Sequence, residues 1–129
     1  MPMCFIHGHR PRSDAEVSAL IDALHAALRE ALSIPEDDHD IRYQEHRAAF
    51  CRVPGGKTAE YLLVVIHMFQ GRSLEAKRVL YNAIVEHLSR VGVPPSEVNV
   101  LLHAAPLEDF GLRGGQAACD LDLGFKLDV

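Results

Sequence analysis

Apolar residues recur at helical intervals in two separate stretches of the chain. The first follows Ser13, which opens a Ser-Asp-Ala-Glu sequence with capping-box spacing, and its apolar side chains return every three or four residues until Pro35. The second follows Ser73, a candidate N-cap, and stops at Gly92 before two prolines. These patterns predict two helices, each with one apolar face that packs against other structure.

Five shorter stretches are dense in apolar and β-branched residues, which is typical of strands. They cover Pro2–His7, Ile41–His46, Glu60–Phe69, Val98–Ala104 and Leu123–Val129. The sequence Pro54-Gly55-Gly56 predicts a hairpin-like link between the two halves of the chain, and Gly114-Gly115 predicts a turn in the tail.

The chain also repeats itself at an offset of 60 residues. This shift places Ile6-His7 on Ile66-His67 and Arg12-Ser13 on Arg72-Ser73. A match that continues through strand, turn and helix indicates two copies of one β-α-β unit, over residues 2–53 and 60–104, with a tail over 105–129. Crossovers of this length make the strands of each unit parallel and place both helices on one face of the sheet.

We therefore expect residues 1–129 to form a single domain of the α/β (α+β) class, with one sheet and two helices. Such a layer leaves one sheet face and the sheet edges uncovered, which favours an oligomer. Apolar residues make up 48% of the chain and charged residues 24%, the balance of a globular protein. The longest apolar stretch is too short to span a bilayer and no signal-peptide pattern is present, so we expect a cytoplasmic protein without a membrane partner.

The net charge and the spacing of cysteines and histidines disfavour several kinds of partner and site. A net charge of -5 disfavours nucleic acid as a partner. Three cysteines, without CxxC spacing, argue against a disulfide framework or a cysteine-built zinc site, and we expect them to be reduced and packed. The eight histidines lack the i, i+4 spacing of a His-Glu-x-x-His motif, so no metal is expected. No Gly-x-Gly-x-x-Gly or P-loop motif is present, so no other cofactor is expected either.

Pro2 is the residue with the most unusual chemistry. Removal of Met1 leaves Pro2 with a secondary amine, which is a better base and nucleophile than an ordinary terminal amine. Burial between apolar neighbours disfavours the charged form of such a nitrogen, which brings it toward use at neutral pH. Proline at this position also arises simply from composition, so Pro2 alone does not establish a function.

Motifs along nearly the whole chain, taken in order, resemble the tautomerase superfamily. The likeness lies in the first helix, the loop after it, the second strand, the start of the second helix, the loop after that helix and the tail. The matching segments are Leu20-Ile21-Asp22-Ala23-Leu24-His25, Ile34-Pro35-Glu36-Asp37-Asp38, Gln44-Glu45-His46, Gly71-Arg72-Ser73 with Lys77, Pro94-Pro95-Ser96-Glu97-Val98 and Pro106-Leu107-Glu108-Asp109-Phe110-Gly111. In length the chain is similar to malonate semialdehyde decarboxylase and the cis-3-chloroacrylic acid dehalogenases.

The resemblance implies a homotrimer in which Pro2 is the catalytic base or acid at the floor of each pocket. It also implies that Arg72 holds a substrate carboxylate, a role that suits a guanidinium at the start of a helix. The decarboxylases and dehalogenases carry a second arginine just before this one, where our chain reads His67-Met68-Phe69-Gln70. Losing one cation favours simple proton transfer over decarboxylation or hydration, although Arg113, Arg42 or Arg12 could supply the charge.

Four further residues are candidates by the same resemblance. Asp38 matches an acidic residue that works with water, and His25 matches a histidine of the first helix that bonds a carboxylate or carbonyl. Both positions are equally compatible with ordinary solvated or half-buried side chains. Asn99 and Phe110 are candidates for lining the pocket, with structural packing as the alternative.

Three functions remain open on the sequence. The favoured one is a cofactor-free tautomerase that acts on a small 2-keto acid or its enol. The second is a hydratase-type decarboxylase or dehalogenase of a small acid such as malonate semialdehyde or a 3-haloacrylate, which Asp38 supports and the missing arginine opposes. The third is a non-catalytic trimeric binding protein, which a retained Met1 would favour.

Overall fold

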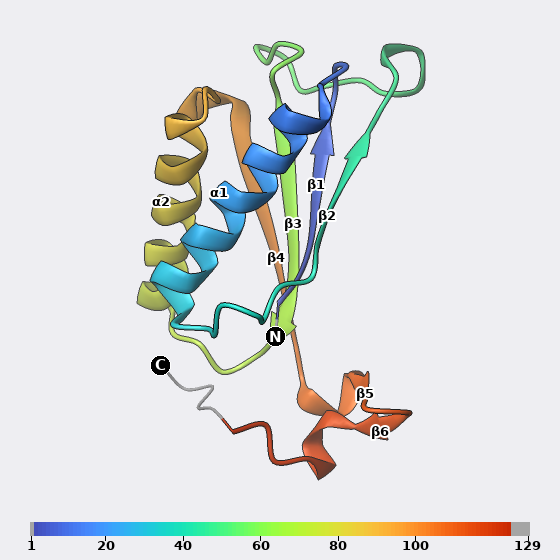
Figure 1. The fold of residues 1–129 in the computed structure, drawn as a ribbon, viewed down its shortest axis with the longest axis vertical. Coiled ribbons are helices and arrows are strands. Elements are labelled where there is room, and N and C mark those ends of the chain that lie inside the picture. The colour runs from blue at the N-terminus through green and yellow to red at the C-terminus, as the bar shows by residue number, and fades with distance from the viewer. Residues whose placement is uncertain (1, 125–129) are drawn as a thin grey trace.

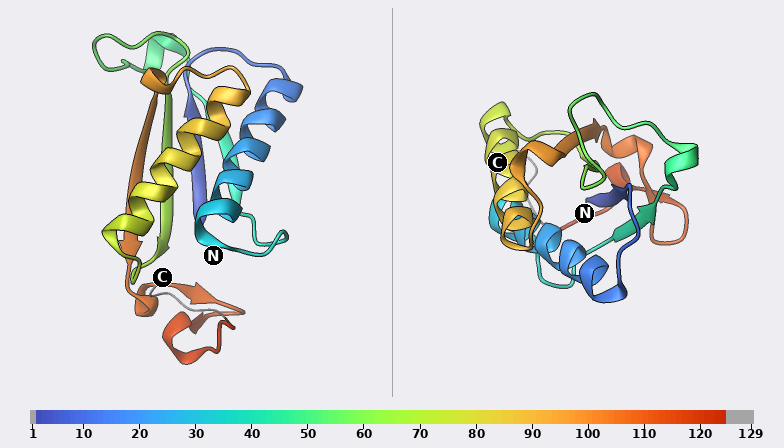
Figure 2. Two further views of the ribbon diagram at one scale, coloured as in Figure 1. Left: turned by 90° about the vertical axis from the view of Figure 1, so that its left-hand side faces the viewer. Right: turned by 90° about the horizontal axis from the view of Figure 1, so that it is seen from above.

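The computed structural model describes residues 2–124 and contains a four-stranded mixed sheet with two helices on one face (Figures 1 and 2). Its main elements are β1 (Met3–Gly8), α1 (Asp14–Leu32), β2 (Ile41–Glu45), β3 (Leu62–Phe69), α2 (Leu74–Arg90) and β4 (Val98–Ala105). The strand order is β2-β1-β3-β4. β1 is parallel to β2 and β3 is parallel to β4, whereas β1 and β3 are antiparallel. The predicted pair of β-α-β units on one sheet is therefore confirmed.

The predicted helix signals have the expected geometry. The side chain of Ser13 accepts a hydrogen bond from the Glu16 amide at 3.2 Å, and the Glu16 carboxylate accepts one from the Ser13 amide at 3.1 Å, which completes the capping box. α1 ends at Ser33, whose φ of 55° is left-handed. In α2 the Ser73 side chain accepts from the Ala76 amide at 3.1 Å.

The core lies between the helices and alternate residues of the central strands. Cys4 and Ile6 of β1 are fully buried on the helix side, as are the facing apolar residues of the other elements. These are mainly Leu24, Leu28, Val64, Ile66, Leu80, Ile84 and Leu88. The intervening residues point to the other face, where Phe5, Val65 and Leu101 are aligned across three strands. Leu101 is 47% exposed, so this chain alone leaves an apolar sheet face uncovered.

The hairpin-like link expected at Pro54-Gly55-Gly56 is wrong. A turn does form there, since the Lys57 amide donates to the Pro54 carbonyl at 3.1 Å. However, β1 lies between β2 and β3, so the segment between these two strands crosses the end of the sheet instead of joining neighbours (Figure 1). Parallel pairing within each unit puts β2 on an edge, and no sequence pattern in the link itself reveals this.

The tail differs from expectation as well. Beyond β4 it forms two short antiparallel strands, β5 (Gly111–Leu112) and β6 (Gln116–Ala117), around the turn expected at Gly114-Gly115. Leu123 and Gly124 are not in a strand, and the rest of the strand expected over Leu123–Val129 lies outside the described residues. These tail strands extend below the main sheet (Figure 1).

The three cysteines differ in their exposure. All three cysteines are free, but only Cys4 is buried, whereas Cys119 is exposed in the tail. The expectation that every cysteine is packed is therefore wrong, because the tail that holds Cys119 lies outside the core. Within residues 2–124 neither α1 nor α2 is long and apolar enough to cross a membrane.

Candidate functional site

The topology brings Pro2 and Arg72 to the same end of the sheet. Met3 pairs with His67 in the antiparallel β1–β3 ladder, so extending the register by one residue sets Pro2 across from Met68. The chain leaves β3 at Phe69 and reaches Arg72 three residues later. Pro2 is buried at this end, which is marked N in Figure 1.

Arg72 stands immediately before the N-cap of α2. Gly71, with φ of 126°, provides the backbone bend between β3 and this helix, a conformation that glycine adopts without strain. The Arg72 side chain is half-buried, and burial lowers the pKa of its guanidinium. Among residues 2–124 no hydrogen bond or ion pair to this guanidinium is found. A partly desolvated cation beside a helix N-terminus suits an anionic ligand.

Asp38 lies near the same end, in the loop that leads to β2. The Cys4 amide donates to the Asp40 carbonyl at 2.8 Å, which ties this loop to the first residues of β1. The pKa of the Cys4 thiol is raised to about 12, mainly by burial and further by the negative charges of Asp40 and Asp38. The Asp38 carboxylate is therefore close enough to act electrostatically on the segment that follows Pro2.

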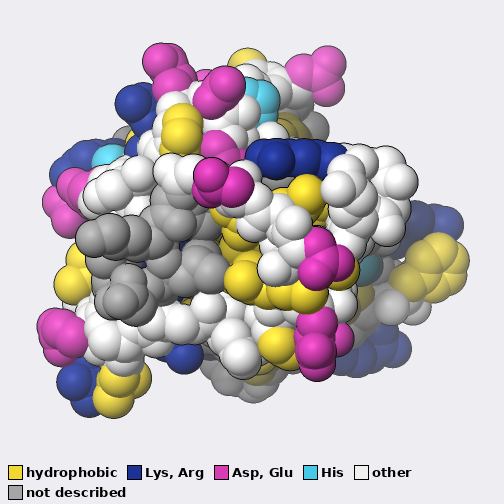
Figure 3. All heavy atoms as spheres, turned by 90° about the horizontal axis from the view of Figure 1, so that it is seen from below, with side chains coloured by type: hydrophobic (Ala, Val, Ile, Leu, Met, Phe, Trp, Pro, Cys, Tyr) yellow, Lys and Arg dark blue, Asp and Glu magenta, His cyan; other side chains and the backbone are white. Residues whose placement is uncertain are grey.

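A pocket of about 430 Å³ opens between this loop and the tail. It is lined by Pro35, Asp37, Asp38, Phe69, Leu112, Arg113 and Leu123. The pocket thus brings together two candidates from the sequence, the Asp38 carboxylate and the Arg113 guanidinium, over an apolar wall. Viewed from below, this end of the molecule shows apolar side chains gathered in a hollow beside a basic one, with acidic side chains around them (Figure 3). Arg72 is not among the residues that line this pocket.

The tail is fixed to the sheet beside this pocket by two aromatic rings. Phe110 stands edge-on to Phe69, with ring centroids 4.6 Å apart. Phe69 belongs to the set of β3 residues that point away from the helices, yet it is only 2% exposed. The sequence analysis selected Phe110 but missed Phe69, Asp37 and Leu112. The position of Phe69 just before Gly71-Arg72 was the available signal.

Two candidates lie elsewhere within the chain. His25 lines a different pocket of about 330 Å³, on the other side of the loop that carries Asp38. Asn99 pairs with Leu63, five strand residues from Met68, which corresponds to roughly 17 Å along β3. Its amide donates to the Tyr61 hydroxyl at 3.2 Å. A single chain therefore does not bring Asn99 to Pro2.

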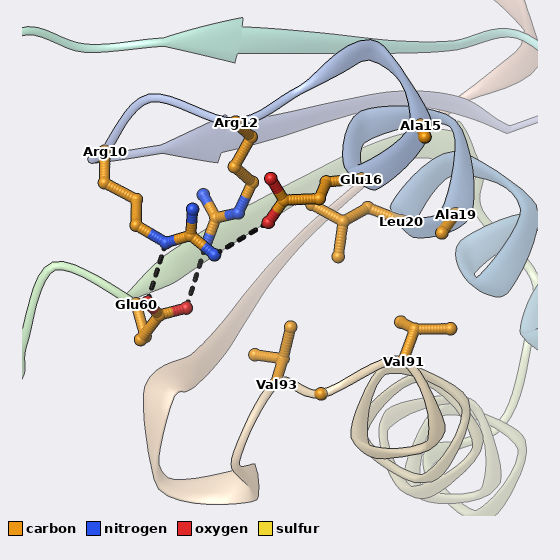
Figure 4. Close-up of a pocket in the computed structure, with 10 residues that line it drawn as sticks. Arg10, Arg12, Ala15, Glu16, Ala19, Leu20, Glu60, Val91 and Val93 are labelled. Atoms are coloured by element: carbon orange, nitrogen blue, oxygen red, sulfur yellow. Dashed lines mark hydrogen bonds and ion pairs between the residues drawn. The ribbon is translucent and has the colours of Figure 1, made fainter.

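Of the three arginines considered as a second cation, only Arg113 lines the pocket with Asp38. Arg12 and Arg10 both turn toward Glu60 at the opposite end of the molecule, in a pocket of about 290 Å³ (Figure 4). The Arg12 side chain is 2% exposed and also donates to the Tyr43 hydroxyl at 2.9 Å. These bonds hold Arg12 away from the Pro2 end.

Arg42 is held differently from Arg12. Its guanidinium forms an ion pair with Asp40 at 2.6 Å and lies 5.1 Å from the ring centre of Phe5 on the open sheet face. Arg42 is therefore close to the loop before β2, but it is already paired with a carboxylate.

A group of histidines lies near the far end of the sheet. His7 Nδ1 is 2.8 Å from His46 Nε2, and the His9 ring stacks near His46 with centroids 5.5 Å apart. The pKa of His7 is lowered by burial first, and then by the neighbouring imidazoles. Residues 2–124 contain no group of three or more His, Cys, Asp or Glu side chains that could hold a metal ion.

Comparisons with known proteins agree with this architecture. The family model described as "Tautomerase enzyme" (Tautomerase_2) matches residues 40–113. The probable tautomerase YusQ of Bacillus subtilis (strain 168) is 28% identical over 123 residues, which cover 91% of our chain and 97% of that protein.

Solved structures give the same answer for the whole fold. A malonate semialdehyde decarboxylase aligns with a TM-score of 0.83 and 25% identity, over 93% of our chain and 99% of that one. A native fused 4-OT aligns with a TM-score of 0.83 and 26% identity, over 95% and 99% of the two chains. A fused 4-OT described as a symmetric trimer aligns with a TM-score of 0.80 and 28% identity, over 91% and 96%. The family match spans more than half of the sequence, and the chain belongs to the tautomerase enzyme family.

Proposed function

We propose that this protein is a cofactor-free tautomerase that interconverts the keto and enol forms of a small 2-keto acid. In the direction of ketonisation, the Pro2 nitrogen takes the proton from the enol hydroxyl as the carbonyl forms. It then returns a proton to carbon 3, so that one O–H bond is exchanged for one C–H bond. Arg72 holds the carboxylate of the substrate through a bidentate, charge-assisted pair.

The observation that carries this proposal is the half-buried Arg72 guanidinium, without a protein partner among residues 2–124, at the same end as the buried Pro2. A cation held partly out of water favours an anion over a neutral ligand. Arg113 provides a second positive charge at the edge of this region, in the pocket with Asp38. Proton transfer needs less charge neutralisation than loss of carbon dioxide, so Arg72 with Arg113 nearby is sufficient.

The test is the rate of ketonisation of phenylenolpyruvate and 2-hydroxymuconate by the purified protein without its initiator methionine. We expect Pro2→Ala to lower kcat by about 10²–10⁴-fold, the usual contribution of a general base. We expect Arg72→Gln to raise KM by about 10–100-fold, because a charged hydrogen-bond pair is lost. Arg78→Gln is the matched control, since Arg78 is an exposed residue of the same helix that pairs with Glu75 at 3.4 Å. Equal rates for the wild type and Pro2→Ala would contradict the proposal.

We also propose that the active form is a homotrimer. The apolar residues Phe5, Val65 and Leu101 form a row on the sheet face that the helices leave open, and a fused 4-OT relative is a symmetric trimer. Covering this row requires another subunit, and Asn99 on the same face would then approach a neighbouring pocket. Sedimentation equilibrium should give three times the chain mass of 14.3 kDa. Leu101→Asp should dissociate the assembly, whereas Val79→Asp, at an equally exposed position of α2, should not.

A hydratase-type decarboxylase or dehalogenase is the second candidate. Asp38 lines the pocket with Arg113, where it could orient a water molecule, and two malonate semialdehyde decarboxylases are 25% and 26% identical to our chain. The two enzymatic functions differ in their need for this carboxylate. Asp38→Asn should abolish hydration of a substrate, whereas a tautomerase should keep a measurable kcat, lowered by about 10–100-fold.

The third candidate is a non-catalytic trimer, in which Met1 stays attached and acylates the proline nitrogen. Intact mass spectrometry of the purified chain separates this candidate from both enzymes, because it detects the loss of one methionine directly. A uniformly retained Met1 in the native protein would overturn the catalytic role of Pro2.

A further inference from the structure

His25 is bonded to the backbone of the loop between α1 and β2. Its Nε2 lies 2.9 Å from the carbonyl oxygen of Glu36. A carbonyl only accepts hydrogen bonds, so Nε2 carries the hydrogen in this contact. The other ring nitrogen, Nδ1, is buried and has no hydrogen-bond partner among residues 2–124. The His39 ring stands edge-on at a centroid distance of 5.3 Å.

This loop separates two pockets. Glu36 and His39 line the pocket that also contains His25, together with Ile21, Asp22 and Ile41. Asp37 and Asp38 line the pocket on the other side, with Arg113 and Phe69. The bond from His25 therefore holds the loop on the side of the first pocket, whereas Asp38 lines the pocket on the other side.

Among residues 2–124, the backbone hydrogen bonds of this loop lie at its ends and within it. At the helix end, the Ser33 amide donates to the Arg29 carbonyl at 3.0 Å, and at the strand end the Cys4 amide donates to Asp40. The Asp38 amide closes a turn onto the Pro35 carbonyl at 3.1 Å. This turn is a bond within the loop, between two of its own residues. The His25 bond ties the middle of the loop to α1.

We propose that His25 is a positioning residue, which sets the place of Asp38 through the Glu36 carbonyl and does not exchange protons with the substrate. This proposal rests on the proposed function, because an effect of Asp38 on the rate requires that Asp38 borders the place where the substrate reacts. His25 faces the opposite side of the loop from Asp38, which separates it from the pocket of Asp38 and Arg113. Displacement of a polar group by about 1 Å in such a site costs up to about 10²-fold in rate.

Two substitutions of similar polarity distinguish positioning from proton transfer. His25→Gln keeps an amide N–H near the place of Nε2 and should still donate to Glu36. His25→Asn has an amide too short to reach that carbonyl. We expect His25→Gln to stay within about threefold of the wild-type kcat and His25→Asn to lose about tenfold or more, with KM little changed in both. His39→Gln is the control, because His39 lines the same pocket.

The coupling of His25 to Asp38 is the readout that a purely structural role would not move. If His25 acts through Asp38, the loss caused by His25→Asn should shrink when it is introduced into Asp38→Asn. An equal loss in both backgrounds, or equal damage from Gln and Asn at position 25, would overturn the proposal. Asp38→Asn with full activity and His25→Asn without activity would also overturn it.

A measurement without substrate keeps this proposal separate from the tautomerase proposal. Hydrogen exchange of the 34–40 peptide should accelerate in His25→Asn and remain as in the wild type in His25→Gln, whatever reaction the protein catalyses. Unchanged exchange in His25→Asn would overturn the positioning role. Inactivity of every variant together with this exchange pattern would contradict only the tautomerase function.

Discussion

The ring of Phe110 meets the ring of Phe69 edge-on, at a centroid distance of 4.6 Å and an interplanar angle of 80°. One ring belongs to the tail and the other to the last residue of β3. This contact fixes the tail beside the exit of β3, and the chain then continues to Arg72 on one side and the pocket with Arg113 on the other. The tail is therefore a wall of the candidate site as well as an extension of the fold.

Replacing Phe110 tests whether the tail depends on this contact. Phe110→Ala should lower the free energy of unfolding by about 1–3 kcal/mol, because a half-buried ring and its aromatic pair are lost. Urea unfolding of the two proteins measures the difference. Phe50→Ala removes a ring that is 75% exposed and should change stability by less than about 0.5 kcal/mol. Similar losses in both variants would show that the tail contact contributes little.

The two arginines that share Glu60 should differ in their importance for stability. Arg12 is 2% exposed on its side chain and has a second bond to Tyr43, whereas Arg10 is 31% exposed. We expect Arg12→Gln to cost about 1–3 kcal/mol, since the charged bond to Glu60 and the bond to the half-buried Tyr43 hydroxyl are both lost. Arg10→Gln should cost at most about 1 kcal/mol, as is usual for a surface ion pair. Thermal and urea unfolding of both variants check the order, and a larger cost for Arg10→Gln would contradict it.

Local signals in the sequence were sufficient for the helices and the main strands. The capping box at Ser13 and the alternation of buried and outward residues around Cys4 and Ile6 depend on neighbours along the chain. The order of the strands within the sheet requires knowledge of which strands pair, so the crossing of the link after β2 was not predictable from its glycines. β5 and β6 are two residues each, too short to carry any periodicity.

The candidate site was predictable only in part for a related reason. Arg72 and Asp38 were selected through the resemblance to the tautomerase superfamily, which for Arg72 is supported by its place at a helix start. Phe69 reads as one more apolar residue of a buried strand, and its second role becomes visible only when the tail folds back onto it. The separation of His25 on α1 from Asp38 depends on how the loop between α1 and β2 is oriented, which no spacing in the sequence determines.

The histidine pair at the far end of the sheet predicts acid sensitivity. The pKa of His7 is lowered from its ordinary value of 6.5, chiefly by burial and then by His46 and His9. As the pH falls below about 6.5, the unfolded chain binds this proton before the folded protein does. Stability from this group is therefore complete above pH 6.5 and is lost as the pH falls toward the folded pKa. Urea unfolding between pH 8 and 5 should show a shallower decline for His7→Gln, and an unchanged slope would rule out this cause.

The two repeats have equivalent N-cap serines, Ser13 for α1 and Ser73 for α2, so the same loss of an N-cap can be made at either end of the molecule. Ser13 and Ser73 each accept a hydrogen bond from the amide three residues later, so Ser13→Ala and Ser73→Ala should each cost about 1 kcal/mol of stability. Ser73 directly follows Arg72, and loss of its cap should loosen the start of α2 and raise KM for a carboxylate substrate severalfold. Ser13 follows Arg12 at the opposite end, where the same loss should leave KM unchanged. Steady-state kinetics of both variants measure this difference. Since the two variants should lose similar stability, a difference in KM reflects the position of the lost N-cap. Equal KM values would mean that the start of α2 does not position the carboxylate-binding arginine.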